Sequence, residues 1–567
     1  MRTIMLNKIS RLREYSDGAS IKSSDKDCGL KLNFERHTYI DGNMTFTANY
    51  IDILLKTSVL LRLEIALLLI VATFLLIYYA PSKLKRQRPL PPGPGLLKFL
   101  ITNLNQPQLP PWRAAQEWHK TYGPIISLQL GQLVIISIGS YEVAHDLLEK
   151  RKDIYDSRPH LIVGGECVTR GLDFILLPSD SRWKAHRRLA SNFLSNRQTR
   201  RYRYLQDIES KQLLYDLLGS KDFSGEFRRF NLSIITTLAY GKRIESGMNR
   251  EIKDVTKIIH NQTASVTQFG LVEAFPILNR LPHWAAPWKR MGDAIFKITD
   301  KFFQESMQYA QSSTSYNWAR QIFDFKETQG LPLVELSHMI GVLVEGGLET
   351  TTSAVEFFTM ASILYPESVG KAQEELDSVV GQDRLPSFDD TSNLPYVNAF
   401  IKEVLRWRPV LPIGVAHSPI KDDEYLGYRI PKGAIVVGNQ WAINMNDESF
   451  QNPHEFRPER WLQHPDQPLC AFGFGRRICP GKQIAQNSLF IAIARILWAY
   501  NVSHCYFNGK KVPIDSLDIP QTLLGTPSPF QASFSIKSPE HQRIVEQEWE
   551  STVTDVNLTM DHVHSLK

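Results

Sequence analysis

Apolar residues recur at intervals of three and four over residues 333–365, the longest helical pattern in the chain. Leu336 and Ile340 are examples of this spacing, which predicts one long buried α-helix. Gly346 and Gly347 interrupt the pattern, although a glycine inside a helix costs about 1 kcal/mol relative to alanine. We therefore expect the space left by the two missing side chains to serve a function.

Helical periodicity covers most of the remaining chain, and only a few segments have the pattern of strands. Residues 125–138 alternate around Gly131 and Gln132, which predicts a β-hairpin. Residues 483–500 predict an amphipathic helix near the C-terminus. The sequence shows no internal repeat or low-complexity tract, so we expect a single large domain that is mainly α with small β-sheets.

An uncharged apolar run at residues 65–80 extends back to about 20 residues, the length that crosses a hydrocarbon layer of roughly 30 Å. A basic cluster and a proline-glycine segment follow it, which predicts a hinge and a cytoplasmic main domain. A buried helix is the alternative. We expect an N-terminal extension at 1–57, a single transmembrane helix at 58–80, a hinge at 81–95, the main domain at 96–540 and a C-terminal tail at 541–567.

The composition narrows the class of protein. With 65 basic and 59 acidic residues, the formal charge of +6 does not indicate a nucleic-acid binder. Five scattered cysteines without a CxxC pair argue against a disulfide framework or a zinc site. The extension carries a sequon at Asn43, which becomes a glycosylation candidate if the extension is lumenal. No role for residues 1–57 follows from the sequence.

Cys479 stands in the segment FGFGRRICPG, just ahead of the helix predicted at 483–500. A helix N-terminus brings unpaired N–H groups and the positive end of the dipole near the sulfur, which favours the thiolate. A thiolate without His or Cys partners is a poor zinc site but a good axial ligand for haem iron. A buried structural cysteine beside a helix cap is the alternative.

The spacing around Cys479 follows F-x-x-G-x-R-x-C-x-G and resembles the cysteine loop of the cytochrome P450 family. The resemblance implies the cytochrome P450 fold and haem b (iron protoporphyrin IX), with Cys479 as the axial ligand of the iron. It further implies that Arg477 pairs with a haem propionate and that Gly475 permits a turn near the sulfur. Phe472 would pack beside the ligand and shield it.

Two further segments resemble the same family. Glu403 and Arg406 are neighbours on one helix face, a pair that is common on surfaces. Together with Arg460 they resemble the Glu-Arg-Arg network that holds the cysteine loop of the family in place.

Trp183 and Arg187, four apart in the segment SRWKAHRR, resemble the family's propionate ligands, although an ordinary amphipathic helix is the alternative. His417 occupies the position of another propionate partner, where Ala416 replaces the usual preceding proline.

Residues 346–351 match the family's (A/G)-G-x-(D/E)-T-(T/S) pattern. The resemblance makes Glu349 and Thr350 an acid-alcohol pair that relays protons to oxygen on the iron. Gly346 and Gly347 would leave room for that oxygen on the face opposite Cys479, which makes Gly347 a cofactor contact. Surface and cap positions are the alternative for a glutamate and a threonine in a helix.

The resemblance implies a monooxygenase that inserts one atom of O2 into a lipophilic small molecule. NADPH would supply electrons through NADPH-cytochrome P450 reductase, with cytochrome b5 as a second candidate partner. Four basic residues would form the face that docks the acidic reductase: Lys184, Arg188, Arg476 and Lys482. Ordinary solvated surface charge is the alternative interpretation of these residues. A haem-thiolate isomerase or dehydratase that needs no reductase, and a non-catalytic haem-binding protein, are the alternative functions.

The sequence, including the segments RRICPG and EFRPERWL, resembles fungal members of the family that oxidise secondary metabolites, such as the sterigmatocystin-pathway oxidoreductases. We therefore expect a single-pass protein of the endoplasmic reticulum membrane whose catalytic domain is cytoplasmic.

Overall fold

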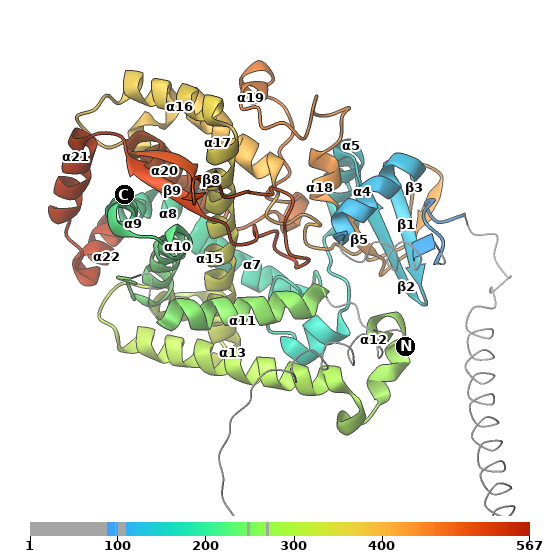
Figure 1. Ribbon diagram of the computed structural model, residues 1–567. Coiled ribbons are helices and arrows are strands. Elements are labelled where there is room, and N and C mark those ends of the chain that lie inside the picture. The colour runs from blue at the N-terminus through green and yellow to red at the C-terminus, as the bar shows by residue number, and fades with distance from the viewer. Residues whose placement is uncertain (1–87, 97, 100–108, 247–249, 268–270, 567) are drawn as a thin grey trace, which may run out of the picture. The chain divides into compact units, whose positions relative to one another are not determined.

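The computed structural model describes residues 88–96, 98–99, 109–246, 250–267 and 271–566 (Figure 1). The predicted extension, the transmembrane helix at 58–80 and Asn43 lie outside these residues, as does the part of the hinge at 81–87. Across the described ranges, no helix has both the length and the apolar character needed to cross a bilayer.

The long helix predicted at 333–365 is present as α15, Leu333–Leu364. At 1.5 Å per residue its 32 residues extend over about 48 Å. Figure 1 shows α15 in the middle of the helical part, crossed near one end by α11 (Arg250–Thr267) and α13 (Pro287–Ser312). Most of its residues are buried on all sides, as expected of a helix at the centre of a large core.

The helices packed around α15 bring the candidate site together. They include α10 (Phe223–Tyr240), α17 (Pro395–Trp407) and α20 (Lys482–Ala499), the last of which confirms the helix predicted at 483–500. The other helices used below are α4 (Pro111–Tyr122), α7 (Ser181–Leu194), α9 (Arg203–Gly219), α16 (Pro366–Val379), α18 (Gln440–Asn444) and α19 (Glu459–Gln463).

The predicted hairpin forms β1 (Ile125–Leu130) and β2 (Leu133–Ile138), with Leu130 opposite Leu133. Gly131 makes the turn at a φ of 61°, which is the left-handed region that glycine favours. Strand β5 (Ile435–Gly438) pairs parallel to β2 and completes a three-stranded sheet. Three two-stranded sheets complete the described strands: β3 (Asp423–Tyr425) with β4 (Tyr428–Ile430), β6 (Tyr500–His504) with β9 (Ala532–Ile536), and β7 (Tyr506–Phe507) with β8 (Lys510–Lys511).

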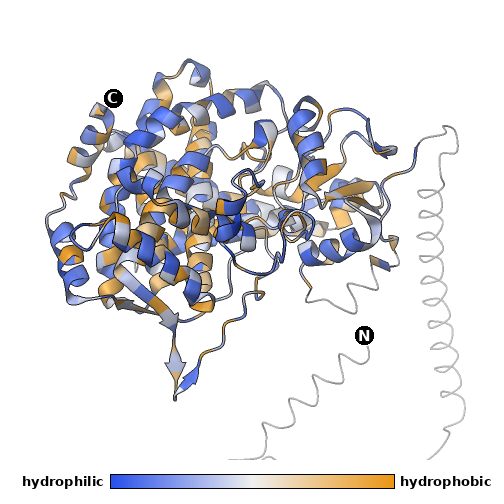
Figure 2. Ribbon diagram, turned by 90° about the horizontal axis from the view of Figure 1, so that it is seen from above, coloured by the Kyte–Doolittle hydropathy of each residue, from blue (hydrophilic) through white to orange (hydrophobic). Residues whose placement is uncertain are grey.

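Two apolar cores lie beneath these elements. The larger core joins the helices around α15, and a smaller one lies between the three-stranded sheet and the segment that follows it. Figure 2 shows the hydrophilic colour mainly on outward-facing helix sides, while the hydrophobic colour gathers between the helices. Phe474 of the cysteine loop belongs to the smaller core, so this core anchors the loop.

Residues 541–567, predicted as a tail, instead form part of the helical domain. Helices α21 (Pro539–Glu550) and α22 (Val556–Ser565) pack on α9, and their apolar side chains, among them Val545 and Met560, are buried in the larger core. Their burial offsets the cost of ordering the segment, so no structural break occurs at residue 540.

Candidate active site

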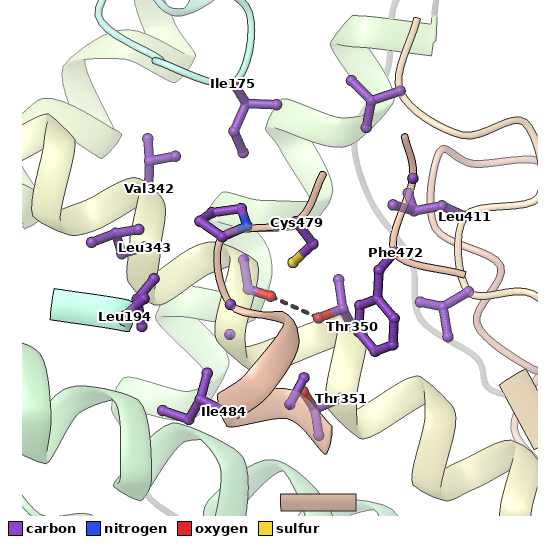
Figure 3. Close-up of a pocket in the computed structure, with 18 of the residues that line it drawn as sticks. Ile175, Leu194, Val342, Leu343, Thr350, Thr351, Leu411, Phe472, Cys479 and Ile484 are labelled. Atoms are coloured by element: carbon purple, nitrogen blue, oxygen red, sulfur yellow. Dashed lines mark hydrogen bonds between the residues drawn. The ribbon is translucent and has the colours of Figure 1, made fainter. Parts of the chain in front are cut away.

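The cysteine loop, residues 472–481, lies between α19 and α20 and closes on itself through backbone hydrogen bonds. The Cys479 N–H donates to the Phe472 carbonyl at 2.9 Å, and the Ile478 N–H donates to the Gly475 carbonyl at 3.2 Å. This closure leaves the Cys479 sulfur facing an internal cavity instead of packing into the core (Figure 3). Cys479 is accordingly exposed to that cavity, unlike Cys470, which is buried.

Gly475 occupies a position that no other residue fits. Its φ is 58°, and a Cβ atom there would collide with the carbonyl oxygen of Leu148. Its N–H donates to the Glu149 carboxylate at 2.5 Å. The predicted turn is present, and the close approach that demands glycine is to the segment at 148–149.

The pKa of Cys479 is not lowered as expected from the helix N-terminus alone. Burial raises the pKa of its thiol above the ordinary value, whereas the Gly481 N–H, Arg187 and Lys482 lower it in part. Desolvation therefore outweighs the helix N-terminus, and the loop alone does not make Cys479 a thiolate. A cation bound at the sulfur would supply the missing stabilisation, because a metal ligand must be deprotonated.

Cys479 and helix α15 face each other across a cavity of about 280 Å³. Gly346, Gly347, Thr350 and Thr351 line it on the α15 side. Most of its other walls are apolar, and Figure 3 shows Phe472, Ile484, Leu343 and Leu411 around the cysteine. Such a cavity suits a large apolar ligand that is bound at one sulfur.

Polar side chains gather at another part of the same cavity. Arg477 donates to the carbonyls of Asp156 at 2.5 Å and Leu177 at 2.8 Å, and its guanidinium lies 3.8 Å from the centre of the Trp183 ring. Arg187 donates to the Ile478 carbonyl at 2.7 Å, which joins α7 to the cysteine loop.

His417 and Arg158 complete this polar wall. The His417 ring Nδ1 lies 2.9 Å from the Tyr155 carbonyl oxygen, and Arg158 donates to carbonyls of the 415–416 segment. The structure thus brings together the predicted propionate partners Trp183, Arg187, His417 and Arg477. Arg158 was missed in the sequence, where its only signal is a basic residue in the short segment DSRP.

The positive charges of this polar wall are not balanced by acidic side chains among the described residues that line the cavity. Burial lowers the pKa of Arg477 to about 8, with Arg158 and Arg187 adding repulsion, and burial lowers the pKa of Arg158 to about 10. The pKa of His417 falls to about 3, again mainly by burial, so its ring is neutral. Guanidinium groups hold their protons at neutral pH, so the arginines repel one another and favour an anionic ligand.

The predicted Glu-Arg-Arg network forms in full. The Glu403 carboxylate accepts hydrogen bonds from Arg406 at 2.8 and 2.9 Å and from Arg460 at 3.1 Å. The Arg457 N–H at 2.9 Å and the Trp461 indole N–H at 3.0 Å complete its shell, and the sequence did not indicate either donor. The network ties α17 to the segment that leads through α19 into the cysteine loop.

Glu349 and Thr350 do not lie side by side at the cavity. The Thr350 hydroxyl lines it and donates to the Gly346 carbonyl at 2.7 Å, as the dashed line in Figure 3 shows. The Glu349 carboxylate points instead toward α10 and α11, 3.6 Å from the Arg228 guanidinium and 3.2 Å from the Thr256 hydroxyl. Successive helical residues are rotated by about 100°, so the predicted relay has no direct hydrogen bond between its two members.

The two glycines of α15 have different surroundings. A Cβ at Gly346 would meet no atom within 4 Å, because the residue borders open cavity. A Cβ at Gly347 would lie 3.0 Å from Cγ1 of Ile235, so this glycine permits the close approach of α10. Gly347 lines the cavity as predicted, but the open space lies at Gly346.

Comparison with known proteins agrees with this geometry. The sequence model described as Cytochrome P450 matches residues 89–534. The chain belongs to the cytochrome P450 family. Cytochrome P450 monooxygenase FrzL of Cladobotryum sp is 43% identical over 87% of this chain and 96% of its own length. Cytochrome P450 monooxygenases aneD of Aspergillus aculeatus and peniB of Penicillium patulum are each 42% identical, covering 84% and 83% of this chain and 94% and 89% of their own lengths.

These matches confirm the predicted family and the enzyme class, a haem-thiolate monooxygenase. A solved zebrafish cytochrome P450 with abiraterone has a TM-score of 0.63 and 22% identity, and the alignment covers 76% of this chain and all of that chain. This similarity confirms the predicted cytochrome P450 fold.

The family implies haem iron as the cofactor, and the residues present fit it. Cys479 would hold the iron, since its sulfur faces the cavity. The crowded arginines Arg158, Arg187 and Arg477, together with Trp183 and His417, would hold the acidic side chains of the porphyrin. Phe472 and the other apolar walls would cover its ring.

The predicted reductase face is only partly available. Lys184, Arg188 and Lys482 are exposed and form no ion pair with an acid in the described part of the chain. Arg476 is paired with Asp153 at 2.5 Å and with Asp156 at 3.1 Å, so internal acids already balance its charge. Three of the four predicted residues therefore remain as candidates for an acidic partner.

Proposed function

We propose that this cytochrome P450 oxidises an apolar small molecule bound in a second, larger cavity of about 530 Å³. This cavity carries the proposal because Gly346 and Thr350 line both it and the cavity at Cys479. Most of its walls are apolar and come from α4, the three-stranded sheet and the segment at 411–416. A mainly apolar cavity with a few polar groups suits a lipophilic small molecule.

In the proposed reaction, residues of this chain position the substrate and handle protons. The apolar walls exclude water, and Gly346, which lines both cavities, adds no side chain between them. Haem iron bound at Cys479 supplies the activation of dioxygen. The Thr350 hydroxyl donates to the Gly346 carbonyl, lines both cavities and would hold a proton at Oγ1.

The electrons come from NADPH through a partner reductase in this proposal. An acidic reductase surface would meet Lys184 and Arg188 of α7 and Lys482 at the start of α20. The hydrogen bond from Arg187 to Ile478 connects α7 to the cysteine loop. The oxidised molecule would be a fungal secondary metabolite, and the enzyme would act at the endoplasmic reticulum membrane.

Labelled dioxygen tests the proposal. Full-length enzyme, NADPH-cytochrome P450 reductase and NADPH are incubated under isotopically labelled dioxygen with extracts of a strain that lacks the gene and accumulates the precursor. We expect one labelled oxygen atom in a product whose formation needs both NADPH and reductase, and no product from Cys479→Ala. Product formation without reductase and without label would instead indicate an isomerase or dehydratase.

A further inference from the structure

Glu345 of α15 is a half-buried acid for which the reaction proposed above has no use. It lies one residue before Gly346 and lines the larger cavity. Its Oε1 atom is inaccessible and has no hydrogen-bond partner, and its carboxyl forms no ion pair within the described ranges. Burying a carboxyl without a partner costs free energy, so most such groups in native proteins are satisfied. Because the Glu345 side chain lines the cavity, a ligand bound there is the natural candidate to pair with its carboxyl.

The charges around this cavity are unbalanced. Among its described lining residues, the other ionisable side chains are Arg158 and Asp173. Arg158 donates to the carbonyls of Ile175, Val415 and Ala416 at 2.9, 3.0 and 2.6 Å, and Asp173 accepts from the Ile175 N–H at 2.8 Å. Two acids thus face one base, and the base already donates to backbone groups.

The protonation of Glu345 reflects this imbalance. Burial, followed by the charge of Asp173, raises the pKa of Glu345 well above its ordinary value. Burial also raises the pKa of Asp173, to about 6, although the Ile175 N–H and Arg158 oppose it. Without a cation in the cavity, burial and Asp173 therefore disfavour the charged form of Glu345. A positive charge beside the carboxyl would favour the ionised form.

We propose that Glu345 anchors a basic nitrogen of an otherwise apolar substrate, so that the substrate class of this enzyme is a lipophilic amine. The inference rests on the proposed function and deepens it. A neutral amine that enters the cavity takes the proton of the Glu345 carboxyl, and the products are an ammonium and a carboxylate joined by a charge-assisted hydrogen bond. Apolar walls strengthen this ion pair because they exclude water.

The anchor also affects which part of the substrate reacts. Glu345 belongs to the rigid helix α15 and comes directly before Gly346, which lines both cavities. A nitrogen held there leaves the apolar remainder of the molecule to occupy the space toward Thr350 and Cys479. Hence the distance between the nitrogen and the oxidised carbon would be set by this one carboxyl.

The test uses full-length, haem-loaded enzyme and two probes of similar size: N,N-dimethyl-4-phenylbutylamine and its carbon isostere 2-methyl-6-phenylhexane. Binding of each is followed by the change in haem absorbance. We expect the wild type to bind the amine more tightly. Glu345→Gln should raise the Kd of the amine by about tenfold or more and change that of the hydrocarbon less than about twofold, as for loss of one charge-assisted hydrogen bond.

Glu349→Gln is the matched control, because it removes a carboxylate of the same helix that points away from the cavity. It should leave the ratio of the two Kd values unchanged. Equal Kd values for both probes in the wild type would overturn the inference, as would an unchanged ratio in Glu345→Gln. Should that variant fail to fold, the wild-type ratio alone decides. Failure of the proposed function would give a different result. The product would then contain no labelled oxygen, while the enzyme would still bind the amine more tightly than the hydrocarbon.

Discussion

Removal of the Glu403 carboxylate should be among the most damaging single changes to this enzyme outside the cavity. Glu403 and Arg406 are each 0% exposed, and Arg460 is 1% exposed. In Glu403→Ala, five hydrogen bonds to the carboxylate are lost, and two buried guanidinium groups keep their charge without a counter-ion. Removing one partner from a buried ion pair costs about 3–5 kcal/mol.

That cost is a large fraction of the roughly 5–15 kcal/mol by which most domains are stable. Because the network leads into the cysteine loop, haem retention should fall together with stability. The measurement is urea unfolding of the haem-loaded enzyme, followed both by far-UV circular dichroism and by haem absorbance. Glu403→Gln should lose nearly as much, since an amide keeps the shape but removes the charge.

The matched control is Lys371→Ala, which breaks the ion pair between Lys371 and Glu459 at 2.6 Å. The Lys371 side chain is 55% exposed, so water screens this ion pair and its loss should cost far less than loss of the Glu403 carboxylate. If Glu403→Ala is no more destabilising than Lys371→Ala, the argument from buried charge is refuted.

Three further predictions concern helix α15. Thr350→Ala should leave haem binding intact but divert NADPH consumption into peroxide, measured as the ratio of product to NADPH, and unchanged coupling would exclude Thr350 from proton handling. Gly346→Ala should stabilise the fold by about 1 kcal/mol in thermal unfolding, since its methyl meets open space, yet weaken substrate binding, whereas Gly347→Ala should lose that gain against Ile235. Burial raises the pKa of Glu356 to about 7, so its contribution to stability is present below pH 4.5 and is lost as pH rises through 7. Glu356→Gln should therefore gain roughly 3 kcal/mol relative to wild type between pH 5 and pH 8 in urea unfolding, and a constant difference would contradict the shift.

Much of the site could be predicted from local sequence alone. The cysteine loop, the long helix and the hairpin depend on contacts or periodicities within a few residues, so their patterns are visible in the chain. The Glu403 network could also be predicted, because two members are three apart on one helix. Arg158 could not, since nothing near it in sequence shows that it meets Arg187 and Arg477.

By itself, the sequence determined the long helix α15, the hairpin, the helix after the cysteine loop, the family and the chemistry available at Cys479, but not the C-terminal helices α21 and α22. Only the tertiary structure decided what surrounds each side of α15. Glu345 and Glu349, four residues apart, lie on the same side of the helix, whereas the rotation of about 100° per residue sends the side chain of Thr350 in another direction. Which direction leads into a cavity depends on how α10, α11 and the cysteine loop pack around the helix. These contacts join residues that are far apart in the chain, such as Thr256 and Glu349 with a separation of 93 positions, so no local pattern could reveal them.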